Sequence, residues 1–346
     1  LFLASAGLYQ RSQEVMNTYG LLSGQRTISE YSVTVDREVI NDRSNARYLI
    51  EENIADPTFL DLGMEMDSFI DKAATLSDES SFTLLCKWAC TQQGDDLKQV
   101  FGGAEFVGRL GTFKRIAGAL YQPQKEAWKM VAVKLGGIII LGRDKISDRT
   151  KISIYSPCKF KQYMTADRPG GSADLTSPVD NRSSFERVVR SDVTFCMRTL
   201  KLCSMVQVDA LCGEEAVVLK AVVETGNGLA CKVDQVVASE LSGVKRVVTG
   251  FKNNNHDIQG YYVEKVVSRR VSEMKQTLNG AELKGYAMLF DVLSQVKAVL
   301  QGATACEIKL NPHSIDVNVT PISMEDAKKR NYRVTPEFAT RFNLDV

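Results

Sequence analysis

The sequence lacks the residues and motifs on which common metal and catalytic sites depend. Only two histidines are present, His256 and His313, and each follows turn-forming residues, where a solvated imidazole is the expected state. None of the cysteines forms a Cys-x-x-Cys pair, and the eight are spread over positions 86, 90, 158, 196, 203, 212, 231 and 306. This spacing excludes a zinc-finger layout, and a chain of this length needs no disulfide framework. We therefore expect free thiols and no secretion.

The chain also lacks a net charge and a long apolar run. Its 43 Lys and Arg residues balance 42 Asp and Glu residues, so the whole molecule exerts no strong field on a charged partner. The nearest approach to a membrane span is the stretch 136–141, far below the ~18 residues that crossing requires, and we expect no membrane insertion. The opening LFLASAGLYQ has no basic segment before its apolar residues, and we expect it to belong to the fold.

Nucleotide loops and serine-nucleophile elbows are missing as well. The sequence has no G-x-x-x-x-G-K-[ST] loop, no G-x-G-x-x-G after an expected strand and no G-x-S-x-G. The glycine pairs at 102–103, 136–137 and 170–171 are explained as turns. The sequence therefore predicts no cofactor.

What is present is an ordinary globular composition. The chain has 346 residues, of which 44% are apolar and 25% are charged, enough for two lobes with proper cores. We predict an α+β fold, predominantly helical with small antiparallel sheet elements. The predicted division is an N-terminal lobe (1–165), a turn-rich loop or linker (166–184), a C-terminal lobe (185–323) and a C-terminal arm (324–346).

Hydrophobic periodicity predicts the individual elements. Helices are expected at 1–22, 45–54, 59–76, 82–90, 214–224, 261–278 and 281–300. Strands are expected at 29–39, 128–135, 137–142, 151–155, 231–237, 244–250, 306–310 and 314–319. The stretch 185–208 fits neither period and is left open.

The clearest pattern lies in 261–300. Val263, Val266, Val267 and Val271 recur at helical spacing, with charged residues between them. Asn279 and a following glycine then separate this stretch from a second apolar series. The pattern predicts an antiparallel helical hairpin.

Several basic clusters with aromatic neighbours are candidates for contacts with RNA, because cations neutralise phosphates and aromatic rings stack on bases. The alternative for each cluster is an ordinary solvated surface, and only convergence in the fold would make a site. The candidate residues are Lys114, Arg115, Lys159, Lys161, Tyr163, Lys245, Arg246, Lys252, Arg269 and Arg270.

A second group could hold a metal ion. Glu307 and Lys309 form a Glu-x-Lys on an expected strand, and Asp291 lies upstream. Metal-dependent nucleases use an acidic pair to hold Mg²⁺ and a lysine to orient the attacking water. Charge alternation along any strand edge also produces Glu-x-Lys. Glu65 and Asp67 lie two residues apart on an expected helix and favour a solvated face.

Three functions remain open. The leading hypothesis is a non-enzymatic, self-assembling structural protein that coats RNA, of the viral nucleocapsid or coat-subunit type, cytoplasmic or in a virion. Its partners would be RNA and identical subunits. The alternatives are a metal-dependent nuclease or other nucleic-acid enzyme, and a lattice or matrix protein without RNA.

Overall fold

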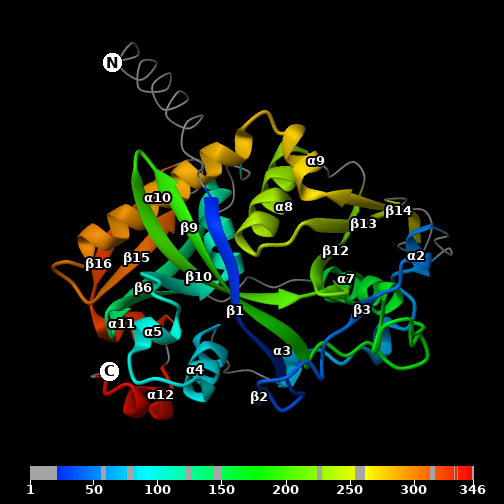
Figure 1. Cartoon of the computed structure of the whole chain (residues 1–346), viewed down its shortest axis with the longest axis horizontal. Coiled ribbons are helices and arrows are strands. Elements are labelled where there is room, and N and C mark those ends of the chain that lie inside the picture. Colours follow the sequence, from blue (N-terminus) through cyan, green and yellow to red (C-terminus); the bar gives the residue numbers. More distant parts are fainter. Residues whose placement is uncertain are drawn as a thin grey trace.

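Two large mixed β-sheets form the centre of the protein (Figure 1). The computed structural model describes residues 22–55, 60–75, 81–121, 127–143, 150–223, 228–253, 262–311, 316–330, 332 and 334–344. The prediction of a mainly helical fold with small antiparallel sheets is wrong, because valine-rich segments that were expected to be helical or left open pair instead as long strands. The expected helix at 1–22 and both histidines lie outside the described residues, apart from Leu22.

The first sheet has nine strands and both parallel and antiparallel pairs. Their order is β16 (Val317–Ile322), β15 (Ala305–Leu310), β6 (Trp128–Leu135), β7 (Ile138–Arg143), β5 (Phe106–Arg109), β10 (Arg198–Val208), β9 (Ser184–Phe195), β1 (Leu22–Val33) and β2 (Val39–Ile40). The hairpins of β6 with β7 and of β15 with β16 confirm the strands predicted there.

The second sheet has seven strands. Their order is β4 (Leu60–Asp61), β14 (Tyr262–Arg270), β13 (Arg246–Lys252), β12 (Glu215–Val223), β11 (Ala210–Cys212), β3 (Tyr48–Leu49) and β8 (Thr165–Ala166). Asp209 alone separates β10 of the first sheet from β11 of the second, so one continuous stretch of chain joins the two sheets. Both sheets draw strands from before and after 166–184, and the four-part division of the chain stays a prediction.

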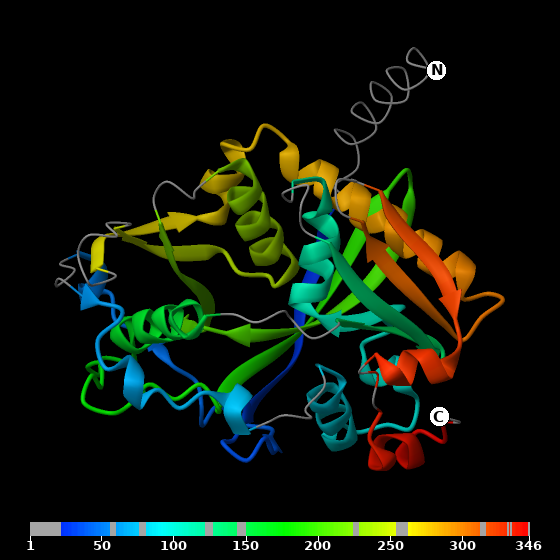
Figure 2. The ribbon, with the colours of Figure 1, turned by 180° about the vertical axis from the view of Figure 1, so that it is seen from behind.

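Helices cover both faces of the nine-stranded sheet. On one face lie α6 (Leu110–Ala117), α8 (Leu229–Leu241) and α10 (Ala281–Val299), with η2 (Ala119–Tyr121). On the other lie α4 (Ser81–Thr91), α5 (Leu97–Val100), α11 (Met324–Lys329) and α12 (Pro336–Arg341), which gather at one end of the molecule (Figure 2). The segment expected as a C-terminal arm thus contributes Ala327, Tyr332 and Phe338 to this core.

The remaining helices belong to the seven-stranded sheet and its surroundings. They are α7 (Lys151–Met164), which packs on β12, α2 (Glu52–Ala55), α3 (Lys72–Thr75), α9 (Val271–Gln276) and the short η1 (Met66–Ser68). No helix among the described residues is long and apolar enough to cross a bilayer.

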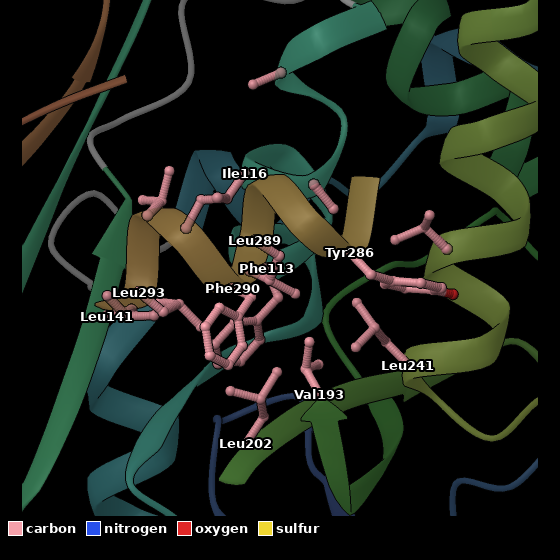
Figure 3. Packing of buried hydrophobic residues seen from close by; sticks show 14 of the residues in the cluster. Phe113, Ile116, Leu141, Val193, Leu202, Leu241, Tyr286, Leu289, Phe290 and Leu293 are labelled. Atoms are coloured by element: carbon pink, nitrogen blue, oxygen red, sulfur yellow. The ribbon is translucent and has the colours of Figure 1, made fainter. Parts of the chain in front are cut away.

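The largest core lies between α6, α8 and α10 and the first sheet (Figure 3). Tyr286 and Phe290 of α10 are buried there together with Phe113 of α6. Tyr286 places its hydroxyl 2.6 Å from Oε2 of Glu240 on α8, so its polar end is satisfied although its ring is buried. This packing fixes α8 beside the junction of the two sheets.

The predicted helix at 261–278 is β14 followed by the short α9. A β-bulge explains the false helical period: Lys252 pairs with Val263 and Phe251 with Lys265, which leaves Glu264 as the extra residue. Val263 and Val266 are therefore both buried although they lie three residues apart. The bulge imitates the spacing of a helix.

Three further predictions were wrong for a related reason. The segment 214–224 is strand β12, 151–155 begins helix α7, and 231–237 lies within α8. In each case the short apolar pattern fits either a helix or a strand, and packing against neighbouring elements determines which of the two forms. The helices predicted at 82–90 and 281–300 are confirmed as α4 and α10.

Candidate functional site

A cleft opens where β10, β11 and β12 meet, beside α6, α7 and α8. It consists of two hollows of about 330 and 290 Å³. Lys161, Gln207, Val208 and Asp209 line both of them, so the hollows adjoin at the sheet junction. A cleft of this size accommodates a small ligand or the end of a chain.

Asp209 occupies the centre of this cleft. Its Oδ2 accepts a hydrogen bond of 3.0 Å from the backbone N–H of Leu219 on β12. Its Oδ1 lies 2.5 Å from Nζ of Lys161, in the last turn of α7. Both carboxylate oxygens therefore have a partner within the protein, and the Asp209 side chain is only 11% exposed.

Two lysines face this carboxylate with opposite consequences. Burial would lower the pKa of Lys161, but the charge of Asp209 outweighs it and the pKa is raised. For Lys220 on β12, burial lowers the pKa and the nearby Lys114 and Lys161 add to the effect, with Asp209 opposing it. Among the described residues Lys220 forms no ion pair within 4 Å, so Asp209 and Asp234 compensate its charge only from a greater distance.

Other cations around the cleft are paired with acids. Lys114 of α6 lies 2.8 Å from Oδ2 of Asp234 on α8. Arg109 lies 3.2 Å from Oε1 of the buried Glu186. These pairs leave the lining of the second hollow rich in positive charge, with five Lys and Arg side chains against the carboxylates of Asp209 and Asp234.

Four of the ten predicted RNA-contacting residues converge on this part of the surface. Lys114 and Lys161 line the cleft, and Lys245 and Arg270 line a groove next to it. The other six line neither the cleft nor the groove. Lys159 pairs with Glu65, and Arg246 pairs with Glu51. Lys252 lies 3.5 Å from the Ser156 hydroxyl and Tyr163 is buried; Arg115 and Arg269 complete the six. RNA contacts at these residues stay a prediction.

The predicted metal-binding group is not brought together. Asp291 accepts a hydrogen bond from Gln295 on its own helix. Glu307 on β15 pairs with Arg330 and lies 3.9 Å from Lys129. Lys309 lies on the same strand, far along the sheet order from the cleft.

Asp209 and Lys220 were not among the residues predicted from the sequence. Their signal is an aspartate at the end of one valine-rich strand, followed eleven residues later by a lysine among valines. The signal was lost because 214–224 was predicted as a helix.

The part of the chain that carries this cleft places the protein in a nuclease-related class. Residues 25–224, more than half of the chain, match the family model described as RAI1 like PD-(D/E)XK nuclease. The chain belongs to this family. The match ends before Asp291, Glu307 and Lys309, so those residues are not the ones that carry the family resemblance.

Particular relatives agree with this assignment. The decapping nuclease dom-3 of Caenorhabditis elegans is 28% identical over 178 residues, which cover 48% of this chain and 44% of that protein; the chain thus matches under half of this relative's length. The crystal structure of Scheffersomyces stipitis Rai1 with (3'-NADP)+ and calcium ion has a TM-score of 0.74 at 14% identity, covering 94% of this chain and 96% of that chain. The structure of Candida albicans Rai1 with pU5 and Mn²⁺ has a TM-score of 0.71 at 16% identity, covering 92% and 95%.

These findings overturn the leading hypothesis of a viral nucleocapsid or coat subunit. At the level of the family they favour the nuclease alternative. The relatives' complexes contain RNA or nucleotides, in keeping with the expected class of partner, and none of the three concerns an assembly of identical subunits.

The cleft does not fit the divalent cation that the family implies. The family is named for an acidic residue two positions before a lysine, and at the strand that carries Lys220 this position is Val218. The acid-x-Lys that does occur within the match runs from Asp96 to Lys98; it lies at the start of α5, where Asp96 is the N-cap, and lines neither hollow. Among the described residues no three His, Cys, Asp or Glu side chains are placed to hold a metal ion. Mg²⁺ and Ca²⁺ require carboxylate and other oxygen ligands, and here the ammonium of Lys161 lies against the one central carboxylate.

Proposed function

We propose that the chain binds the 5′ end of an RNA strand in this cleft and holds it without metal-dependent hydrolysis. The observation that carries the proposal is the pairing of Lys161 with Asp209 beside Val218 and Lys220. This arrangement keeps a positive lining for phosphate in the second hollow and lacks, beside Lys220, the acidic pair that would hold a catalytic cation.

The charge of the second hollow supports an anionic ligand. Lys220 has a lowered pKa because burial and neighbouring lysines disfavour its charge, and a bound phosphate would relieve that cost. Lys114 of α6 lines the same hollow. Two ammonium groups that converge on one hollow suit a terminal phosphate, which carries more charge than a phosphodiester.

The choice of an RNA end rests on the relatives. The C. elegans relative is named a decapping nuclease, and decapping acts at the 5′ end of RNA. The C. albicans structure holds pU5. The two hollows here have room for a terminal nucleotide or two and not for a duplex.

The test is binding of fluorescent pU5, with and without its 5′-phosphate, by anisotropy in EDTA and again in Mn²⁺. We expect binding that depends on the 5′-phosphate, is unchanged by EDTA, and leaves the RNA intact on a denaturing gel after incubation in Mn²⁺. Lys220→Met should weaken binding about tenfold or more, because a charged hydrogen bond to phosphate is lost. Lys328→Met on α11, exposed and distant from the cleft, is the matched control.

Cleavage of pU5 that requires Mn²⁺ and disappears in Asp209→Asn would refute the proposal. That result would support the nuclease alternative instead. The Asp209→Asn arm distinguishes activity of this chain from that of a contaminating nuclease.

A further inference from the structure

A second basic groove lies beside the cleft and has no role in the function proposed above. It has a volume of about 610 Å³ and lies between β1, β9, the turn after α8 and the start of α9. Five cationic side chains and one carboxylate line it: Arg26, Arg187, Lys245, Arg270 and Lys275, with Glu240.

The single carboxylate is already neutralised. Oε1 of Glu240 accepts a 2.9 Å bond from Lys275, and Oε2 accepts the Tyr286 hydroxyl at 2.6 Å. These contacts leave Glu240 little capacity to repel or replace an incoming anion. The groove therefore has a net positive lining even though the whole chain is close to neutral.

Three of the cations are available to a ligand. Arg26 and Arg270 are exposed and form no ion pair among the described residues. Lys245 is 75% exposed and lies 3.8 Å from the similarly exposed Glu215, a pair that contributes little in water. Exposed cations without firm partners neutralise phosphates at small cost, since no existing ion pair must be broken.

The groove is continuous with the cleft. Arg187, Ser242 and Val244 line both this groove and the second hollow of the cleft. Arg187 is held in place by Glu30 at 2.5 Å and by the backbone carbonyl of Glu214 at 3.0 Å. A strand that leaves the cleft past Arg187 enters the groove directly.

We propose that this groove binds the phosphates of the nucleotides that follow the 5′ end held in the cleft. The inference rests on the proposed function and adds the length of RNA that is recognised. Among the described residues no aromatic side chain lines the groove, so the contacts are to the backbone and independent of sequence.

The test compares 5′-phosphorylated pU2, which fills the cleft alone, with pU8, which reaches the groove. For the unmodified chain we expect pU8 to bind at least tenfold more tightly. The variant Arg26→Ala/Lys245→Ala/Arg270→Ala should lose most of this advantage while its affinity for pU2 stays within twofold. The slope of log affinity for pU8 against log salt should fall by about 0.7 for each phosphate contact removed.

The matched control is Lys201→Ala/Lys265→Ala/Lys328→Ala, which removes three exposed lysines that line neither the cleft nor the groove. Thermal unfolding of each variant checks that it is folded. Equal affinity of the unmodified chain for pU2 and pU8 would overturn the inference and leave the proposed function intact. The same conclusion would follow if the control variant lost as much affinity for pU8 as the groove variant. Failure of both oligonucleotides to bind would overturn the proposed function itself.

Discussion

Nζ of Lys161 lies 2.5 Å from Oδ1 of Asp209, at the point where the two sheets join. In a family named for paired acidic residues near a lysine, this contact places an ammonium against the central carboxylate. The ion pair satisfies Asp209 without an external cation. The second hollow, which Lys220 also lines, keeps an excess of positive side chains, which favours a phosphate ligand there.

Restoring carboxylates should restore affinity for a divalent cation. Lys161→Ala combined with Val218→Glu frees Asp209 and adds a second acid on the strand that carries Lys220. We expect a saturable rise in Tm with MnCl₂, since a ligand at a hundred times its Kd stabilises by about 2.7 kcal/mol. Differential scanning fluorimetry measures it. The control is Lys161→Ala alone. A rise in Tm with Mn²⁺ in the unmodified chain, lost in Asp209→Asn, would contradict the conclusion that the cleft does not fit a divalent cation.

Removing Lys161 should also destabilise the fold. Lys161→Met leaves the mostly buried Asp209 without its partner, and we expect a loss of about 1–3 kcal/mol in the free energy of unfolding at pH 7, between the values for exposed and buried pairs. Because the folded pKa of Lys161 is raised, the pair is fully formed below the unfolded pKa and is lost only as pH rises through the folded one.

Urea unfolding at pH 7 and pH 9 should therefore show the same difference between Lys161→Met and the unmodified chain. Lys329→Met, which breaks an exposed pair with Glu325, is the control and should change stability by less than about 0.5 kcal/mol. A difference that vanishes between pH 7 and pH 9 would mean that the ammonium is not paired as described.

Lys220 should make RNA binding sensitive to alkaline pH. Its folded pKa is lowered, mainly by burial, so the free protein releases this proton below the ordinary range of lysine. Because the folded state binds fewer protons than the unfolded state in that window, stability rises with pH there, and affinity for phosphate falls as the positive charge is lost. Titration of pU2 binding from pH 7 to pH 10 measures the effect. Lys220→Met should remove this part of the pH dependence; an unchanged profile would assign it to another group.

Gly250 tests the packing of α7 on the second sheet. A Cβ at this position would lie 2.5 Å from Cε2 of Phe160, inside a closed core. We expect Gly250→Ala to lower the free energy of unfolding by about 1–3 kcal/mol through overpacking. Gly302→Ala, where a Cβ meets nothing within 4 Å, is the control and should be near neutral. Equal stabilities in urea unfolding would show that Phe160 moves aside without strain.

Local sequence determined several elements of this protein. The short apolar runs of β6 and β7, separated by a glycine pair, and the long amphipathic α10 can be identified without reference to a distant partner. The abundance of valine in β12 and β14 pointed to strands, but bulges and short apolar runs gave periods that also suited helices.

The sequence by itself also determined that familiar catalytic motifs are absent and that cations occur in small clusters. Only the tertiary structure decided which of these meet, because Lys114, Lys161 and Lys220 come from three elements far apart in the chain. The contacts of Asp209 likewise depend on the tertiary structure. They are made with Lys161, 48 positions earlier, and with strand β12, which follows Asp209 in the chain. Local periodicity specifies helices and strands over a few residues. A site depends on long-range packing, which brings charged side chains together and so pairs charges that would be costly to bury alone.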